Sequence, residues 1–393
     1  MAASGNEALG LQALAHNPVN ALHSKFCMKF DKVPVTDGQE GVTYDGDAAG
    51  TVHFAFAFPG ATFVLLWTPQ ATVPLQPSPT APGIWTATAQ LPVGFRYVYV
   101  MVDSKDTLVP YLPIGYGYCR PVNFIDVPPP DMRSCIYAMR RGVEYGTVVH
   151  NFFDSSETSA VENLLVYLPP SYHKAGSAAR RYPVLYLQHG LGENENGWVY
   201  HGKVNVIADN LIADGAMTEM IIVMGNGTMF ENGEVSPEVY CRQLVSDIIP
   251  YIDNHYRTKA DRDNRAIAGL SMGSMQTSRL CMTRHDLFAY AGVFSGFLRA
   301  RWSGIGTADD DHIDVLRRDP AAFQAAMRVF FRCMGDDDTF RAVFEEDDAL
   351  LADLGVACER RMYAGPHSWQ VWRQAAADFL PLLFKGITSP CRR

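Results

Sequence analysis

The most constraining feature of this sequence is an apolar run that leads directly into Gly-Leu-Ser-Met-Gly at residues 269–273. The run at 265–268 is typical of a buried strand, and the five residues after it fit the Gly-x-Ser-x-Gly pattern of a nucleophile elbow. A serine on such a sharp strand-to-helix turn needs neighbours almost without side chains two positions away, and Gly269 and Gly273 satisfy this. The pattern also occurs in glycine-rich turns. The preceding strand and the helix-compatible run at 275–285 favour Ser271 as a nucleophile.

Length and composition set the broad class of protein. A chain of 393 residues exceeds one ordinary domain, so we expect two, and 48% hydrophobic with 19% charged residues excludes disordered and fibrous proteins. The formal net charge of −9 repels nucleic acid and anionic membranes, so neither is an expected partner. Solubility alone is the simpler explanation of that charge.

Cysteine spacing and the N-terminal sequence bear on compartment and cofactors. The eight cysteines form no Cys-x-x-Cys pair, so we expect reduced thiols, and neither a zinc site nor any other metal. The N-terminus lacks the pattern of a signal peptide, and no apolar run reaches membrane-spanning length. A cytoplasmic location is therefore expected, although a secreted protein whose signal peptide had been replaced by Met1 would look the same. The sequence does not determine whether the chain forms a homo-oligomer.

The first third of the chain predicts a small all-β domain. Residues 1–40 are poorly periodic and are interpreted as an N-terminal arm. Residues 41–130 carry short aromatic and β-branched runs at 51–56, 63–67, 83–88 and 95–103, which predict a β-sandwich. Its aromatic residues could line a sugar-binding face, although those of a sandwich more often form the core. Three prolines at 128–130 indicate the linker.

The rest of the chain, 131–393, alternates strands with helices. Strands are expected at 161–168, 182–188, 220–224, 265–268, 290–294, 329–334 and 357–363, and helices at 204–213, 243–255, 340–354 and 369–379. This alternation predicts a fold of the α/β class, with a mostly parallel sheet covered on both faces. An elbow at the carboxyl edge of such a sheet is the α/β-hydrolase arrangement.

In that arrangement the catalytic histidine follows the nucleophile in the chain, which leaves three candidates. His285 falls inside or just after the elbow helix, and His312 lies in an acidic stretch that suggests a solvated turn. His367 follows a strand and an Ala-Gly-Pro turn, which is where a catalytic histidine is expected. The alternative role for His367 is to cap the helix at 369–379.

The acid and the oxyanion hole are expected on two other loops. The strand at 329–335 runs into three aspartates, of which we choose Asp338 to orient the histidine, with Asp337 second, and the other two are expected to cap the next helix. The oxyanion hole needs two backbone N–H groups. We assign that of Met272 and that of Leu191, with Gly192 as the fallback, while His189 is interpreted as shaping the loop.

Substrate contacts are harder to place. Residues expected around an aromatic acyl group are Trp198, Asn226, Met229, Phe230, Trp302 and Trp369. They favour a hydroxycinnamoyl group over acetyl. The region 298–319 is interpreted either as a lid over this pocket or as a plain surface insertion.

Several separated motifs carry a resemblance to a known family. Residues 182–190, 195–198, 205–212, 265–273 and 367–373 resemble the putative-esterase family, which includes the feruloyl and acetylxylan esterases of carbohydrate esterase family 1 and enterochelin-esterase-like enzymes. The resemblance spans about 143–385. It implies an α/β-hydrolase with a triad at Ser271, Asp338 and His367. Ser274 departs from the family, whose members usually have glycine there, and we expect only a slight effect on elbow packing.

The first domain resembles the immunoglobulin-like (E-set, CBM48-like) modules that precede such esterases, on the strength of residues 67–71 and 83–85. Together the resemblances imply a serine esterase that needs no cofactor. The expected substrates are feruloylated oligosaccharides from plant cell walls or small phenolic esters. Alternatives are an acetylxylan or other acetyl esterase, an enterochelin-type siderophore esterase, and a carbohydrate-binding protein with an inactive hydrolase domain. The acidic composition disfavours the anionic siderophore, and the intact triad residues disfavour the inactive protein.

Overall fold

The computed structural model describes residues 41–69, 71–110, 112–131, 135–231, 233–299 and 311–385. The chain forms two compact units, the first ending at Ala138 and the second beginning at Met139. The proline cluster at 128–130, which the sequence indicated as the linker, therefore lies a few residues before the boundary between the two units. The expected arm at 1–40 lies outside the described residues.

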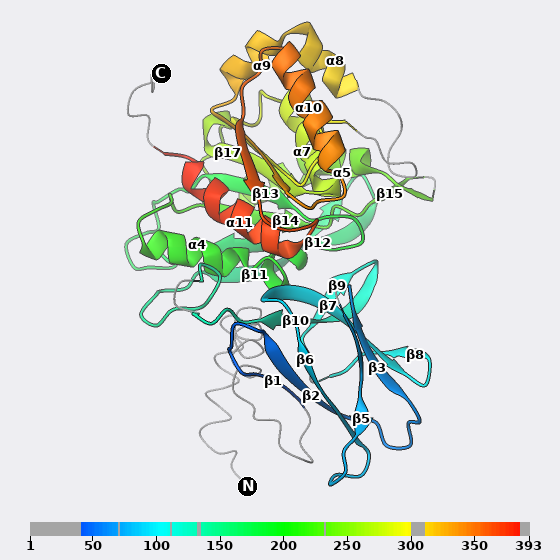
Figure 1. Cartoon of the computed structure of the whole chain (residues 1–393). Helices are drawn as coiled ribbons and strands as arrows, with labels where there is room; N and C mark the ends of the chain where they lie inside the picture. Colours follow the sequence, from blue (N-terminus) through cyan, green and yellow to red (C-terminus); the bar gives the residue numbers. More distant parts are fainter. Residues whose placement is uncertain are drawn as a thin grey trace. The chain divides into compact units, whose positions relative to one another are not determined.

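The first unit is all β, as predicted (Figure 1). Its strands are β1 (Gly41–Tyr44), β2 (Thr51–Ala57), β3 (Val64–Thr68), β4 (Ala71–Pro74), β5 (Gln76–Pro77), β6 (Ile84–Gln90), β7 (Gly94–Val102), β8 (Lys105–Thr107), β9 (Ile114–Gly117) and β10 (Arg120–Val127). They form two antiparallel sheets with the orders β1-β2-β6-β5 and β4-β3-β7-β10-β9, and β8 pairs with β7. Alternate residues of both sheets supply one apolar core, which includes Phe54, Leu66 and Val98.

The aromatic residues of this unit divide between core and surface. Phe54, Phe56 and Trp85 are buried. Trp67 is 44% exposed and lies against Tyr99, with ring centroids 5.0 Å apart. Phe54, Phe56 and Trp85 therefore form part of the core, whereas Trp67 does not. A sugar-binding face stays a prediction.

The second unit contains one mixed sheet of eight strands (Figure 1). Its strands are β11 (Thr147–Ser155), β12 (Ala160–Leu168), β13 (Val184–Gln188), β14 (Ile221–Gly225), β17 (Arg265–Leu270), β18 (Tyr290–Phe294), β19 (Val329–Gly335) and β20 (Glu359–Tyr363), in the order β11-β12-β14-β13-β17-β18-β19-β20. The first two ladders are antiparallel and the rest are parallel. A separate hairpin joins β15 (Phe230–Glu231) to β16 (Glu234–Val235).

Helices cover both faces of this sheet. They are α3 (Gly197–Tyr200), α4 (Val204–Ala213), α5 (Pro237–Gln243), α6 (Ile249–His255), α7 (Met272–Thr283), α8 (Asp311–Arg318), α9 (Pro320–Ala326), α10 (Arg341–Asp353) and α11 (Trp369–Phe379). The helix predicted at 243–255 begins earlier in the structure, at Pro237. It is continuous with α5, because a π-helical stretch, Leu244–Ile248, joins α5 to α6. The region predicted as one insertion at 298–319 contains α8, which the sequence reading missed.

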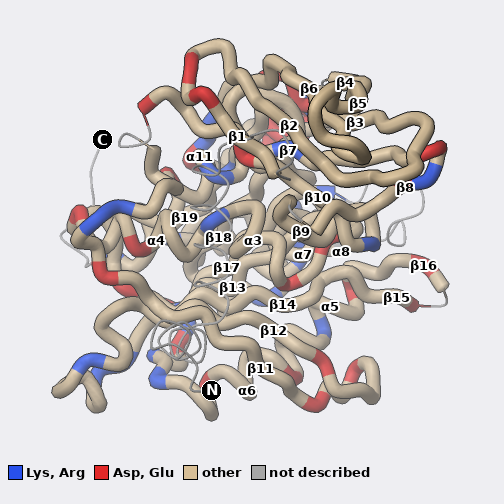
Figure 2. Tube along the Cα trace, turned by 90° about the horizontal axis from the view of Figure 1, so that it is seen from below, with Lys and Arg blue, Asp and Glu red and all other residues tan. Residues whose placement is uncertain are grey.

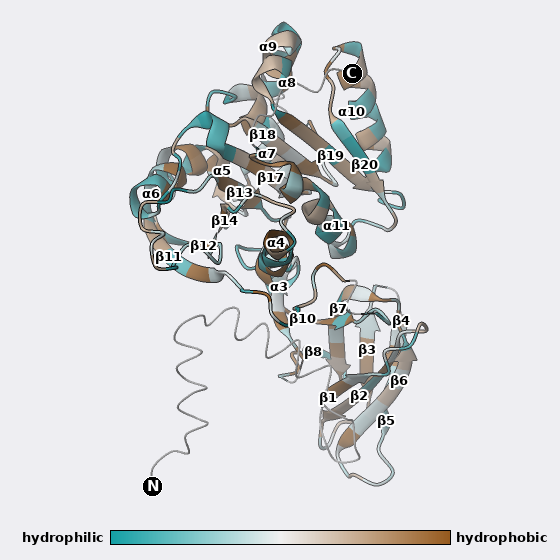
Figure 3. Ribbon diagram, turned by 90° about the vertical axis from the view of Figure 1, so that its left-hand side faces the viewer, coloured by the Kyte–Doolittle hydropathy of each residue, from teal (hydrophilic) through white to brown (hydrophobic). Residues whose placement is uncertain are grey.

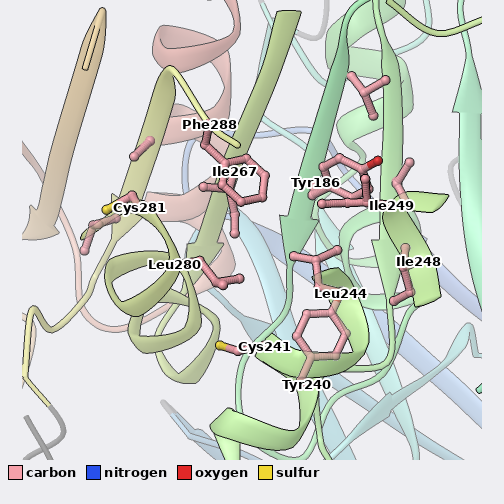
Figure 4. Close-up of a cluster of buried hydrophobic side chains, with 14 of the residues drawn as sticks. Tyr186, Tyr240, Cys241, Leu244, Ile248, Ile249, Ile267, Leu280, Cys281 and Phe288 are labelled. Carbon is pink, nitrogen blue, oxygen red and sulfur yellow. The ribbon is translucent and has the colours of Figure 1, made fainter. Parts of the chain in front are cut away.

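The two faces of the sheet bury different side chains, because successive residues of a strand point to opposite sides. On one face Tyr186 and Ile267 meet the helices α5 and α7, as the close-up in Figure 4 shows. On the other face Phe294 packs edge-to-face against Trp198 of α3 and Phe379 of α11. Figure 3 shows the strands β18 and β19 in apolar brown, whereas α10 carries much polar teal.

The carboxyl ends of the parallel strands meet at one edge of the sheet, so the loops that follow these strands lie at the same edge. β13 ends before His189, β17 before Ser271, β19 before Asp336 and β20 before Ala364. Residues far apart in the sequence therefore come to the same edge. The active-site residues predicted from the sequence lie on these loops.

Helix α4 carries a buried carboxyl group on the side chain of Asp209. Its Oδ1 accepts hydrogen bonds from the Tyr167 hydroxyl (2.6 Å) and the Gly146 N–H (2.9 Å), while Oδ2 has no partner among the described residues. Burial raises the pKa of Asp209 to about 7, against the opposing effect of these hydrogen bonds. The folded protein thus holds a proton on Asp209 that the unfolded chain releases at lower pH.

We expect the stability of Asp209→Asn, measured relative to that of the wild type, to be greater at pH 8 than at pH 5. Since the folded pKa lies above the unfolded one, the stability from this group is full below about pH 4 and is lost as pH rises through 7, at most by about 4 kcal/mol. Asparagine keeps the accepting oxygen and cannot ionise. Urea unfolding of both proteins at the two pH values measures the difference, and an equal loss of stability in the variant at both would contradict it.

The described residues also bear on the sequence-based expectations about charge, thiols and membranes. Figure 2 shows Lys and Arg interspersed with Asp and Glu along both units. Six cysteines are described, all as free thiols, and Cys241, Cys281 and Cys333 are among the buried ones. Within these parts of the chain no helix combines the length and apolar character needed to cross a membrane.

Candidate active site

Ser271 lies on the turn between β17 and α7, with φ 50° and ψ −116° and only 5% exposed. A Cβ atom on Gly269 would lie 2.3 Å from the Gly273 carbonyl oxygen, and one on Gly273 would lie 2.6 Å from that of His189. Neither position has room for a side chain. The steric reason for reading the Gly-x-Ser-x-Gly run as an elbow is thus present in the structure.

Ser274 ties this elbow to the next loop. Its buried hydroxyl donates to the Ser271 carbonyl oxygen and accepts from the Phe297 N–H at 3.0 Å. A Cβ atom at Gly296 would lie 2.3 Å from Ser274 Cβ, so the two loops are in direct contact. The expectation of a slight packing effect was too weak, because Ser274 gives the elbow a hydrogen-bonded connection that glycine cannot make.

We expect Ser274→Ala to destabilise the protein by about 1–3 kcal/mol, because the buried Phe297 N–H loses its acceptor. The matched control is Ser295→Ala. Ser295 is equally buried, but its hydroxyl has no hydrogen-bond partner among the described residues, so its loss should cost nothing. Thermal or urea unfolding of both variants tests this, and equal stabilities would contradict it.

Of the three aspartates after β19, Asp338 contacts the histidine. Its side chain is fully buried, Oδ2 lies 2.8 Å from His367 Nδ1, and Oδ1 accepts the Phe340 N–H at 2.9 Å. Asp336 instead accepts the Gly365 N–H, and Asp337 is exposed. The prediction that these two would cap the next helix was wrong, because α10 has Phe340 at its N-cap and no side-chain cap.

His367 lies on the loop after β20, between two aromatic rings. The Phe340 and Trp372 rings each meet the imidazole edge-to-face at 5.1 Å. Because Nδ1 is bound to Asp338, Nε2 is the nitrogen left for proton transfer. Ser368, and not His367, is the N-cap of α11, so the alternative role as a cap does not apply.

The other two histidines after Ser271 lie elsewhere. His285 comes two residues after Thr283, the last residue of α7, and its Nδ1 is 3.2 Å from the Met282 carbonyl oxygen. The interpretation of His312 as part of a solvated turn was wrong: it is buried on α8 with Nε2 2.6 Å from the Leu298 carbonyl oxygen. An acidic neighbourhood in the sequence suggested exposure, but the helix turns this one residue inward.

Part of the predicted lid is attached to the body of the unit. The Leu298 N–H donates to Asp347 of α10 at 2.8 Å, and Arg299 pairs with the same carboxylate at 2.9 Å. Ile313 and Leu316 of α8 belong to the main core. Residues 300–310, with the predicted substrate contact Trp302, lie outside the described residues.

The loop after β13 packs directly on the nucleophile. A Cβ atom at Gly190 would lie 3.4 Å from Ser271 Cβ. His189 Nε2 accepts the Gly227 N–H and its Nδ1 donates to the Gly190 carbonyl oxygen, both at 2.8 Å, which fixes one neutral tautomer. Burial lowers the pKa of His189, in keeping with this neutral form. His189 thus shapes the loop, as the sequence indicated.

Within that loop two backbone N–H groups are already used. The Gly190 N–H donates to Glu193 Oε2 at 3.2 Å, and the Glu193 N–H donates to the Gly190 carbonyl oxygen at 3.3 Å. Leu191 and Gly192 lie between them and remain the loop's candidates for an oxyanion hole. The N–H of Met272, at the first position of α7, has no acceptor within its helix.

A small group of apolar side chains, here called the elbow cluster, surrounds these loops: Met272, Met275 and Phe297 are buried, and Leu191, Val235, Phe340 and Val343 pack against them. Met272 directly follows the nucleophile, Leu191 belongs to the oxyanion loop, and Phe340 touches His367. The cluster therefore adjoins all three loops.

The predicted substrate contacts are only partly supported. Trp198 and Trp369 are 1% and 2% exposed, and their indole N–H groups donate to Gln188 and Glu193, so both are core residues. Met229 is likewise buried in the main core. These three are corrections: their apolar size suggested a pocket, whereas it serves packing.

Asn226 and Phe230 remain candidates. Asn226 is half-buried, with Oδ1 accepting the Thr228 N–H. Phe230 is 60% exposed and pairs directly with Val235 in the β15–β16 hairpin, so both side chains lie on one face of it. Since Val235 belongs to the elbow cluster, Phe230 extends that apolar surface outward.

Sequence reasoning missed Glu193, Phe297 and Phe340. The motif at 195–198 begins two residues after Glu193, and nothing in the sequence pattern signals a buried carboxylate that accepts N–H groups from two loops. Among the described residues no group of three or more His, Cys, Asp or Glu side chains is placed to hold a metal ion.

The parallel sheet, the elbow and the acid–histidine pair define an α/β-hydrolase fold with a serine-type site. Residues 155–383 match the family described as Putative esterase, and the chain belongs to that family. An endo-1,4-beta-xylanase/feruloyl esterase from Xylanibacter ruminicola is 35% identical over 312 residues, which cover 77% of this chain and 40% of that protein. This chain covers 13% to 40% of the length of the first four curated relatives.

Solved structures give the same fold. A ferulic acid esterase is 29% identical, with a TM-score of 0.54 over 60% of this chain and 97% of its own. The enterobactin esterase from Shigella flexneri is 12% identical, with a TM-score of 0.55 over 84% of this chain and 92% of its own. At that identity the second likeness shows the fold alone.

Proposed function

We propose that the chain is a serine esterase that hydrolyses feruloyl or related hydroxycinnamoyl esters, with Ser271 as nucleophile, His367 as base and Asp338 as its orienting acid. The observation that carries the proposal is the elbow cluster, which brings an apolar surface to Ser271, to the oxyanion loop and to the Asp338–His367 pair together. An acetyl group would use little of that surface. A relative named as a xylanase/feruloyl esterase supports the same substrate class.

The proposed reaction is a two-step acyl transfer. His367 Nε2 takes the proton of the Ser271 hydroxyl as the oxygen attacks the ester carbonyl carbon. The N–H groups of Met272 and Leu191 donate to the oxyanion, and Asp338 stabilises the protonated imidazole. The alcohol leaves with the proton from His367. Water then repeats the sequence on the acyl-enzyme and releases the acid.

The alcohol side is proposed to be a small alcohol or an oligosaccharide. Phe230, outside the elbow cluster on the same hairpin face as Val235, is the proposed outer contact for it. The enterochelin-type alternative needs cations around an anionic complex, and a chain with a net charge of −9 favours it less. The proposed catalytic residues all belong to the second unit.

The test is hydrolysis of methyl ferulate beside p-nitrophenyl acetate by the wild type, with Ser271→Ala as the inactive variant and Ser295→Ala as its matched control. Cleavage of both esters, lost in Ser271→Ala alone, supports the proposal. Cleavage of the acetate alone would indicate an acetyl esterase. Binding of feruloylated oligosaccharide without cleavage of either ester would indicate a binding protein.

A further inference from the structure

Glu193 is a buried carboxylate that touches two separate loops of the site. It is 8% exposed, on the loop between β13 and α3. Oε2 accepts the Gly190 N–H at 3.2 Å and Oε1 accepts the Trp369 indole N–H at 2.9 Å. Its backbone carbonyl also accepts the Thr228 hydroxyl at 3.2 Å. One side-chain oxygen therefore binds the loop after β13, and the other binds the first residue of α11.

Two partners of Glu193, Gly190 and Trp369, lie next to the proposed catalytic groups. Gly190 packs on Ser271 and directly precedes Leu191. Trp369 comes two residues after His367 and meets Trp372 edge-to-face at 5.1 Å, while Trp372 meets the His367 ring at the same distance. The oxyanion loop is thus connected to the His367 imidazole by successive contacts of Glu193, Trp369 and Trp372.

The geometry requires a carboxylate at this position. Both partners are N–H donors, so both oxygens must accept, which an amide of the same shape cannot do. Burial by itself raises the pKa of Glu193, but the hydrogen bond and charge of His201 and the hydrogen bond from the Gly190 N–H outweigh it and lower the pKa. Glu193 is therefore ionised, with His201 Nδ1 3.8 Å from Oε1.

We infer that Glu193 is a positioning residue that holds the oxyanion loop and the histidine loop at their working separation. The inference rests on the proposed esterase function and concerns the same site. Glu193 does not touch the reacting atoms. It acts through Gly190 on the Leu191 N–H and through Trp369 on His367, two groups that act on the transition state and not on the bound ester.

The first test compares Glu193→Gln with Glu195→Gln. Glu195 is a matched control, since it is similarly buried on the same loop but bonds to Asn196 instead of Gly190 or Trp369. With methyl ferulate we expect Glu193→Gln to lower kcat by about 100-fold with KM nearly unchanged, because the amide turns a donor toward an N–H. Binding of a boronic acid that mimics the tetrahedral intermediate should weaken in parallel, whereas binding of ferulate should not. Glu195→Gln should behave as the wild type.

A second variant separates positioning from folding. Trp369→Phe keeps an aromatic ring but removes the indole N–H together with one ring of the indole, so it should lower kcat by a smaller factor than Glu193→Gln if the ring contact with Trp372 is retained. If Glu193 and Trp369 act as one bridge, the double variant should be no slower than Glu193→Gln alone. Additive losses, or a Glu193→Gln whose kcat and boronate affinity match those of Glu195→Gln, would overturn the inference.

The two proposals fail in different ways. A wild type that neither cleaves the esters nor reacts with a fluorophosphonate at Ser271 would overturn the proposed function, and with it the role of Glu193. A wild type that does both, alongside an unaffected Glu193→Gln, would overturn the positioning role alone.

Discussion

Replacing Ser271 by alanine should lower kcat/KM for ester hydrolysis by about 10⁴–10⁶-fold while the protein stays folded. In the proposed reaction the hydroxyl oxygen forms the acyl bond, and the glycines two positions before and after Ser271 leave no room for another reactive side chain. Alanine fits the same turn with one atom fewer. The substrate should still bind, because the elbow cluster is unchanged.

The measurement is initial rates with methyl ferulate, together with thermal unfolding and equilibrium binding of ferulate. Ser295→Ala, at the end of the neighbouring strand, controls for the loss of a buried serine. Residual activity of a tenth or more in Ser271→Ala would mean that another residue is the nucleophile. A lower melting temperature than that of Ser295→Ala would show that the loss is partly one of structure.

Asp338→Asn should cost about 10³–10⁴-fold in kcat with little change in stability. The asparagine oxygen can keep the Phe340 N–H, so its amide nitrogen faces His367 Nδ1 in place of an acceptor. An N–H there stabilises the tautomer that carries its proton on Nε2. Such an imidazole cannot take the proton from Ser271.

Asp337→Asn is the matched control for this change. The Asp337 side chain is exposed, and its loop contact is made by the backbone N–H to the Gly365 carbonyl oxygen, which the substitution leaves intact. Its kcat should stay within about twofold of the wild type, as for a surface substitution away from special features. Equal losses at the two positions would contradict the assignment of Asp338, and a loss at Asp337 alone would favour the second choice made from the sequence.

The sequence was sufficient wherever one physical rule decides the outcome. The glycines of the elbow follow from steric exclusion around Ser271, and the strands of the parallel sheet follow from short apolar runs that have nowhere to lie but in a core. The pairing of His367 with an aspartate after β19 follows from topology, since both loops leave the same edge of the sheet. The choice of Asp338 among three aspartates is consistent with the geometry.

The sequence was insufficient where a side chain's partner is distant in the chain. Trp198 and Trp369 were assigned to a pocket because large aromatics suit both pockets and cores, and only the packing decides. His312 was assigned to the surface because its neighbours are acidic. Glu193 was overlooked because its partner Trp369 is far away in the sequence. In each case the deciding contact is long-range and leaves no local periodicity.

The position of β20 has a consequence for how the protein comes into being. This last strand is the outer edge of the sheet and the one that presents His367, whereas the strand carrying Ser271 lies in the middle. During synthesis Ser271 emerges well before His367, its proposed base. Under the proposed function, a nascent chain therefore carries an inert hydroxyl until β20 and α11 have docked on the sheet.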